Sequence, residues 1–69
     1  MGTKLDRFQA QVLMHLHGGY SRIHIDLANG VVVEIPTEML PPELRYIGKR
    51  ITVVMDGPRI VECEPGESK

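Results

Sequence analysis

Hydrophobic and polar residues alternate along most of this 69-residue chain, most clearly over residues 22–36. In this stretch Ile23, Ile25 and Leu27 alternate with polar residues, and the segment 31–35 is rich in β-branched side chains. Both features are typical of strands that bury one face. The sequence Ala-Asn-Gly at 28–30 separates the two runs and is typical of a tight turn. The pattern therefore predicts a β-hairpin.

The same pattern predicts the register of this hairpin, because a slip of one residue turns every side chain to the opposite face. A two-residue turn at 29–30 would place Ile25 opposite Glu34. A three-residue turn at 28–30 places apolar residues opposite one another and leaves His24 facing Glu34. Its pairs are Leu27 with Val31, Ile25 with Val33 and Ile23 with Ile35. We prefer the three-residue turn because it collects every apolar partner on one face.

The preceding stretch, residues 5–17, fits two periods. A helical face would hold Leu5, Phe8, Val12 and Leu16, whereas a strand would turn inward Phe8, Ala10, Val12, Met14 and Leu16. A two-residue turn at Gly18-Gly19 decides between them, because it extends the apolar face of the hairpin over a third strand. Its pairs are Met14 with Ile23, Val12 with Ile25 and Ala10 with Leu27. We therefore expect a strand.

The second half of the chain predicts one short helical turn and two further strands. Pro41-Pro42 can open the turn within residues 37–48, and Gly48 can close it. Leu40, Leu44 and Ile47 share the side that would cover one end of the sheet. The segments 49–55 and 59–63 have the composition of strands and flank a turn at 56–57. Residues 5–63 are thus expected to form a single domain, followed by a flexible tail at 64–69.

Five short strands with one helical turn between the third and the fourth follow the order of the OB-fold. An open sheet of this size would leave two edges unpaired, and closure into a barrel removes them. The predicted fold is therefore all-β: a small five-stranded OB-like barrel.

Composition narrows the functional classes. The net charge is −1, from eight basic and nine acidic residues, whereas a nucleic-acid-binding domain is usually clearly basic. No run of about 18 apolar residues and no signal-peptide pattern is present, so we expect a cytoplasmic protein without membrane association. Cys63 is the only cysteine and lies between Glu62 and Glu64, where like charge disfavours a thiolate nucleophile. With neither a phosphate-binding loop nor a catalytic triad in the sequence, we expect a non-enzymatic protein without a cofactor.

The run QAQVLMHLHGGYSRIHIDLANGVVVEIP, with LRYIGKRITVVM and RIVECEP, resembles bacterial translation initiation factor one, a single OB domain. The resemblance covers most of residues 8–64. Its main points are Val12 within the first strand, the turn at Asn29-Gly30, and Gly48 before the fourth strand. It implies binding to single-stranded RNA or to a ribosome surface. Where that family carries a basic segment, this chain has the apolar and acidic residues 36–40.

The hairpin, followed by GKRITV and VVMDGPRIVEC, is also similar to the TOBE domain of oxyanion-binding proteins and transporter ATPases. This resemblance implies an oligomer that binds molybdate-like anions at its interfaces. Residues of suitable chemistry are Ser21, Thr37, Lys49 and Thr52. A third hypothesis is a protein-interaction domain without nucleic acid, which the nearly neutral charge favours.

The candidate nucleic-acid or anion site has two parts. OB-folds bind nucleic acid on the outer face of the second and third strands, where the predicted register places Tyr20, Arg22 and His24. The second part is a cluster of three cations and one aromatic ring within six residues, which could hold a phosphate. It consists of Arg45, Tyr46, Lys49 and Arg50. An ordinary solvated surface is the alternative interpretation of both parts.

Two further groups of residues are considered as sites. His15, His17 and His24 carry the imidazoles that zinc prefers, but the register does not bring them together, so we expect surface histidines instead. Leu13, Val32 and Val54 are expected to face outward as an exposed apolar patch. Such a patch suggests a homo-oligomer.

Overall fold

The computed structural model describes residues 4–27 and 29–66, which form five strands and two short 3₁₀ turns. The strands are β1 (Asp6–Leu16), β2 (Tyr20–Ile25), β3 (Val31–Pro36), β4 (Arg50–Asp56) and β5 (Arg59–Pro65). The turns η1 (Thr37–Met39) and η2 (Pro42–Leu44) both lie between β3 and β4. The prediction of an all-β domain with only a short helical segment at this place is confirmed.

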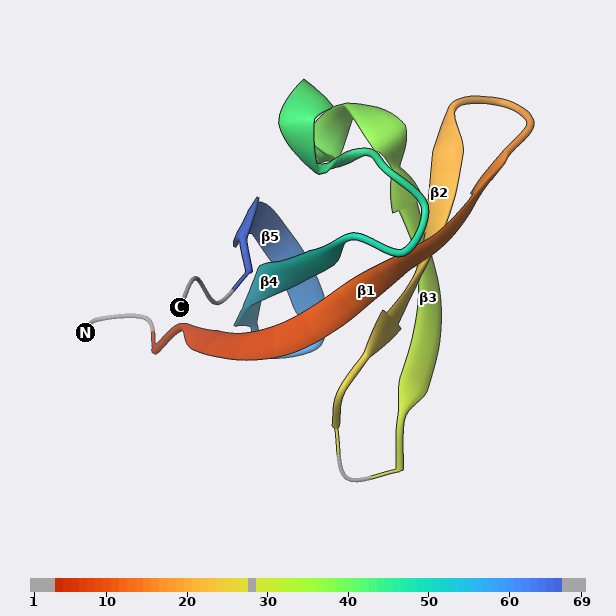
Figure 1. The fold of residues 1–69 in the computed structure, drawn as a ribbon. Helices are drawn as coiled ribbons and strands as arrows, with labels where there is room; N and C mark the ends of the chain where they lie inside the picture. Colours follow the sequence, from red (N-terminus) through yellow and green to blue (C-terminus); the bar gives the residue numbers. More distant parts are fainter. Residues whose placement is uncertain (1–3, 28, 67–69) are drawn as a thin grey trace.

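The strands form one antiparallel sheet in the order β3-β2-β1-β4-β5 (Figure 1). β1 is the central strand: residues 6–11 pair with β4, and residues 10–16 pair with β2. Curling of this long strand bends the sheet into a half-barrel. β3 and β5 have a strand partner on one side only, so the half-barrel is open between them. The two sheet edges that closure into a barrel was expected to remove, those of β3 and β5, are therefore present.

The core lies on the concave face of the half-barrel. It is built from alternate residues of all five strands and from two leucines of the connection between β3 and β4. Its buried members are Ala10, Val12, Ile23, Ile25, Ile35, Leu40, Leu44, Ile51, Val53 and Cys63. Leu40 and Leu44 are buried as predicted, but Ile47 is 61% exposed and is not part of this cover.

A bulge at Leu13 interrupts the pairing of β1 with β2. Val12 pairs with Ile23, and the next pair is Met14 with Arg22, so Leu13 is an extra residue on β1. An extra residue in one strand of an antiparallel pair shifts its alternation by one position. The prediction that Met14 lies opposite Ile23 is wrong, because Met14 lies between the bulge and a turn that is one residue longer than predicted. The predicted pairs Val12 with Ile25 and Ala10 with Leu27 are wrong by two residues, since Val12 lies opposite Ile23 and Ala10 opposite Ile25, and a shift of two keeps both on the buried face.

Beyond the bulge, His15 occupies the row that Met14 was expected to hold. His15 pairs with Ser21, which is fully buried, whereas Met14 is 42% exposed. The turn that follows contains three residues, 17–19, instead of two, since Leu16 pairs with Tyr20. The bulge therefore places the exposed His15 opposite the buried Ser21, with Nδ1 of its ring 2.7 Å from Oγ of Ser21.

The pairing of β2 with β3 also differs from the predicted register. Ile25 pairs with Val31, two residues away from its predicted partner. Residue 28 of the predicted turn lies outside the described residues. A shift of two keeps each side chain on its expected face. It does change the outer pairs, because Glu34 lies opposite Arg22 and not opposite His24.

Two predictions near β4 and β5 are also wrong. β5 continues to Pro65, with Glu64 opposite Thr52, so these residues do not belong to a tail. The last residues of that predicted tail, 67–69, lie outside the described part of the chain. Val54 is only 1% exposed, because it lies on an inner strand between Arg7 and Glu62. It is therefore not part of an exposed apolar patch.

Candidate functional site

The outer face of β2 and β3 has its charges paired within the protein. Nη2 of Arg22 lies 3.1 Å from the carboxylate of Glu34. The carboxylate of Asp26 lies 3.1 Å from Nη2 of Arg50 and 3.4 Å from Nδ1 of His24. A cation that is already held by a carboxylate has to leave it to neutralise a phosphate. This face therefore offers little free positive charge to nucleic acid.

The cluster predicted between η2 and β4 does not form one site. Arg50 is drawn to Asp26 on the outer face, whereas Arg45 lines a cavity. Tyr46 is 68% exposed, and its carbonyl accepts a hydrogen bond from the backbone N–H of Lys49 at 2.9 Å. The four residues are close in sequence, but their side chains do not gather at one site.

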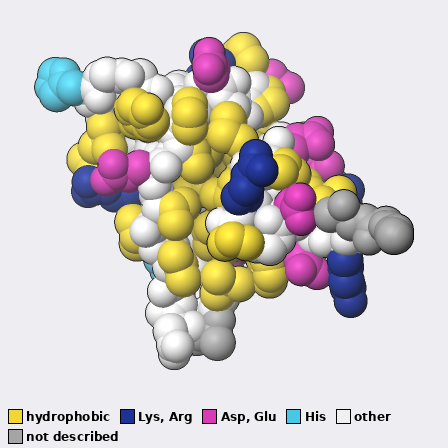
Figure 2. All heavy atoms as spheres, turned by 180° about the vertical axis from the view of Figure 1, so that it is seen from behind, with side chains coloured by type: hydrophobic (Ala, Val, Ile, Leu, Met, Phe, Trp, Pro, Cys, Tyr) yellow, Lys and Arg dark blue, Asp and Glu magenta, His cyan; other side chains and the backbone are white. Residues whose placement is uncertain are grey.

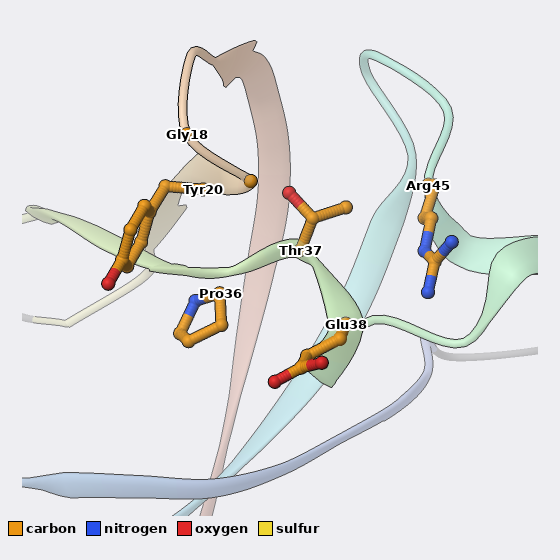
Figure 3. A pocket seen from close by; sticks show the side chains of 7 residues that line it. Gly18, Tyr20, Pro36, Thr37, Glu38 and Arg45 are labelled. Carbon is orange, nitrogen blue, oxygen red and sulfur yellow. The ribbon is translucent and has the colours of Figure 1, made fainter.

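A cavity of about 430 Å³ lies where the turn between β1 and β2 meets the segment after β3. Its lining residues are Gly18, Gly19, Tyr20, Pro36, Thr37, Glu38 and Arg45. In Figure 3 the side chains of Tyr20 and Arg45 lie on opposite sides, with Thr37 and Glu38 between them. The structure thus brings together two predicted site residues, Tyr20 and Arg45, that the sequence placed in separate clusters.

The charged side chains of this cavity are not neutralised by one another. Among the described residues, Arg45 and Glu38 make no ion pair, although they line the same cavity. Arg7, Arg22 and Arg50 each bind a carboxylate. The guanidinium of Arg45 is held in place instead by a 2.7 Å hydrogen bond from Nε to the carbonyl of Leu40. Its terminal nitrogens remain available to a ligand.

A chain of hydrogen bonds leads from the exposed ring of His15, through the buried hydroxyl of Ser21, to the wall of this cavity. Nε2 of His15 lies 2.6 Å from the carbonyl oxygen of Arg45, and Nδ1 lies 2.7 Å from Oγ of Ser21. Oγ of Ser21 lies 2.6 Å from Oγ1 of Thr37, which lines the cavity. Sequence reasoning missed this arrangement, because it placed His15 on the outer face.

The three histidines do not come together. His15 faces Ser21, whereas His24 lies beside Asp26 on the outer face of β2. Across residues 4–27 and 29–66, no group of three metal-ligating side chains lies close enough to hold an ion. The hypothesis of a zinc site formed by His15, His17 and His24 has no support from this geometry.

A second cavity, of about 320 Å³, lies in the opening between β3 and β5, which we call the seam. Its lining residues are Val33, Glu34, Ile35, Pro36, Met39, Met55, Pro58, Arg59 and Ile60. Four of them, Val33, Met39, Met55 and Ile60, are half-buried and pack against the core. Figure 2 shows hydrophobic side chains gathered along the middle of the face opposite to that in Figure 1. Sequence reasoning missed the seam because it expected a closed barrel.

The single cysteine belongs to the core. Burial raises the pKa of the Cys63 thiol from 9.0 to about 11, and the nearby carboxylate of Glu62 acts in the same direction. The sequence had suggested like charge as the reason for a protonated thiol. Burial is the larger cause.

Comparison with known proteins gives no relative for this chain: no family model, no curated protein and no solved structure matches it. The resemblances to translation initiation factor one and to TOBE domains therefore stay predictions. No helix in the described part of the chain has the length and apolar character needed to cross a membrane.

Proposed function

We propose that this protein is a peptide-binding module that takes an extended segment of a partner protein into the seam. The proposal rests on the apolar side chains that form the floor of the seam. There, four apolar side chains of the core remain half-exposed between two strand edges. Burial of such side chains by a partner is favourable by about 25 cal/mol for each Å² of apolar surface removed from water.

The direction of the strands suits one inserted segment. Each of the pairs β1–β2, β2–β3, β1–β4 and β4–β5 is antiparallel, so β3 and β5 both run in the direction of β1. A segment that runs the opposite way is antiparallel to both edges at once. Backbone groups on the outer side of an edge strand are free to pair with such a segment. Every second side chain of the segment would then point into the cavity.

The charges of the rim specify the partner further. Glu34 is held by Arg22, whereas Arg59 makes no ion pair within residues 4–27 and 29–66. The seam therefore suits a segment with apolar residues at alternate positions and an acidic residue beside Arg59. All five strands of the chain are engaged in its own sheet. Among the described residues, no strand is left to fill the seam of a second copy, which favours another protein as the partner.

Selection of peptides from a random display library on the immobilised full chain tests this proposal. We expect enriched peptides with alternating apolar residues, and retention at least about tenfold weaker on an Ile60→Asp variant, because a charge in the seam must be desolvated. Val61→Asp is the matched control, since Val61 is the neighbouring residue, is 41% exposed and does not line the seam. Peptides that bind Ile60→Asp as well as the original chain would contradict the proposal.

Amide shifts measured with an enriched peptide provide a readout that does not depend on the folding of a variant. We expect the largest shifts along β3 and β5. Shifts confined to the outer face of β2 would contradict docking in the seam.

Binding of single-stranded RNA stays a prediction, and so does a homo-oligomer formed through Leu13 and Val32. The paired charges of Arg22 and Arg50 weigh against RNA on the outer face. Titration with oligouridylate, followed by the shifts of Tyr20 and Arg22, separates RNA from peptide binding. Affinity for RNA should fall steeply with salt, whereas insertion of an apolar peptide should not. Measurement of the solution mass tests the homo-oligomer.

A further inference from the structure

We infer that the cavity between Tyr20 and Arg45 binds a small zwitterion, a molecule with an ammonium and a carboxylate group, and that His15 takes up a proton when it binds. This site is separate in chemistry from the apolar seam, and it does not depend on peptide docking. The inference rests on the charges of the cavity and on the hydrogen-bond chain behind it.

The lining of the cavity matches both ends of a zwitterion. The terminal nitrogens of Arg45 can donate to a carboxylate, for which the planar guanidinium has the suitable geometry. Glu38 lies on the same cavity and can accept from an ammonium group, and the ring of Tyr20 adds a face that attracts cations. Because Arg45 and Glu38 do not pair with each other, no internal ion pair has to be broken when the ligand enters.

The direction of the hydrogen-bond chain depends on the charge of His15. A carbonyl oxygen can only accept, so Nε2 of His15 donates to the carbonyl of Arg45 in either state. In neutral His15, Nδ1 then accepts from the hydroxyl of Ser21, and Ser21 in turn accepts from the hydroxyl of Thr37. Thr37 uses its proton inside the protein and presents only lone pairs to the cavity. Lone pairs repel a carboxylate.

Protonation of His15 reverses two of these bonds. Nδ1 now donates to Ser21, and Ser21 donates to Thr37. The hydroxyl proton of Thr37 becomes available to the cavity, where it can bind a carboxylate together with Arg45. Because Ser21 is fully buried, no water at its hydroxyl can interrupt this change. Carboxylate binding and proton uptake by His15 therefore favour one another.

Charged or titratable groups from three parts of the protein surround the hydrogen-bond chain of His15, Ser21 and Thr37. The segment after η2 contributes Arg45, η1 contributes Glu38, and His17 follows His15 by two residues at the end of β1. From β2, the group that faces His15 is the uncharged hydroxyl of Ser21. His17 is a second imidazole at this end of the molecule, so the test needs a variant that removes it.

Titration of the full chain with β-alanine, propionate and ethylamine tests the inference. The readout is the amide shifts of Gly18, Gly19 and Thr37 between about pH 5 and pH 8, where imidazoles titrate. We expect β-alanine to bind at least about tenfold more tightly than either single-charge compound, because it contacts both Arg45 and Glu38. Its affinity should rise by up to about tenfold for each unit of pH decrease, the slope of one linked proton.

The variants locate the proton. His15→Asn and Ser21→Ala should each flatten the pH dependence, whereas His17→Asn should retain it. Ile60→Asp, which tests the seam, should leave β-alanine binding unchanged, so that failure of one proposal is distinguished from failure of the other. The inference is overturned if β-alanine binds no better than propionate. It is also overturned if oligouridylate shifts the amides of Gly18, Gly19 and Thr37 and none of the three small compounds does. A pH slope that survives in both His15→Asn and Ser21→Ala would overturn it too.

Discussion

The polar wall behind the first cavity and the apolar floor of the seam are two different ways to end a half-barrel. At the wall, His15, Ser21 and Thr37 satisfy one another, and no buried side-chain polar atom of the described residues lacks a partner. At the seam, half-buried apolar residues pack against the core, and no strand of the described residues pairs with both β3 and β5 across the opening. Hydrogen bonds require one geometry, whereas apolar contact does not depend on direction. The wall is therefore suited to selecting a small ligand, and the seam to accommodating varied peptides.

Loss of a leucine from the connection between β3 and β4, which covers one end of the sheet and is called the closed end here, should have the largest effect on stability. Leu40 is fully buried there, so Leu40→Ala should lower the free energy of unfolding by about 2–5 kcal/mol. Met39→Ala removes the neighbouring half-buried side chain of the seam, and we expect less than half that loss. Urea unfolding followed by circular dichroism measures both. Equal losses would show that the seam is packed as tightly as the closed end.

Interruption of the polar wall should have the next largest effect. Ser21→Ala leaves Nδ1 of His15 and Oγ1 of Thr37 without their shared partner, and should lower the free energy of unfolding by about 1–3 kcal/mol. Thr37→Val is the comparison, because Ser21 then keeps its bond to His15 and one of the two bonds is lost instead of both, so we expect a smaller loss. Urea unfolding at neutral pH compares the two. If Ser21→Ala is as stable as the original chain, the wall contributes nothing to folding.

A smaller effect should appear only in alkali. Because burial raises the pKa of Cys63 from 9.0 to about 11, the unfolded chain loses the thiol proton at lower pH than the folded chain does. The contribution of Cys63 is present in full below pH 9.0 and should be lost as the pH rises to about 11. The loss should be limited, since Cys63 lies on the edge strand β5, where local opening readmits water. Urea unfolding of the original chain and of Cys63→Ala across this pH range measures the difference between their free energies of unfolding. A difference that does not change with pH would mean that the thiol is already exposed in the folded chain.

The smallest effect should come from the outer face. The ion pair of Arg22 with Glu34 is partly exposed on both sides, so Arg22→Ala should change the free energy of unfolding by less than about 1 kcal/mol. A double-mutant cycle with Glu34→Ala isolates the pair. A coupling energy well above this value, or one insensitive to salt, would mean that the outer face contributes more to stability than its exposure indicates.

The strands could be predicted from the sequence because their signals are local. The alternation of Ile23 and Ile25 with polar residues, together with glycines at the turns, specifies where a strand lies and which face it buries. Burial of Leu40 and Leu44 was predicted from the side that they share on a helical turn, although Ile47, assigned to the same side, is exposed. These signals need no knowledge of the partner strand.

Register and site geometry could not be predicted, because they depend on that partner. The bulge at Leu13 shows only in the pairing with β2, although Leu13 was already an outward-facing apolar residue in the sequence pattern. Tyr20 and Arg45 were each identified as candidates. Their meeting depends on the path of the chain between β3 and β4, which no periodicity describes. The open seam likewise depends on a pairing that does not form.

The extra residue in β1 also affects how this chain should be aligned with other barrels. An alignment that assumes unbroken alternation along the first strand places Met14 in the row of Val12, whereas here Met14 is 42% exposed and His15 lies opposite Ser21. A relative of the same length whose first strand paired regularly after Val12 would place Leu13 opposite Arg22 and Met14 opposite Ser21. In this strand, one unpaired residue decides which side chain lies opposite the buried Ser21.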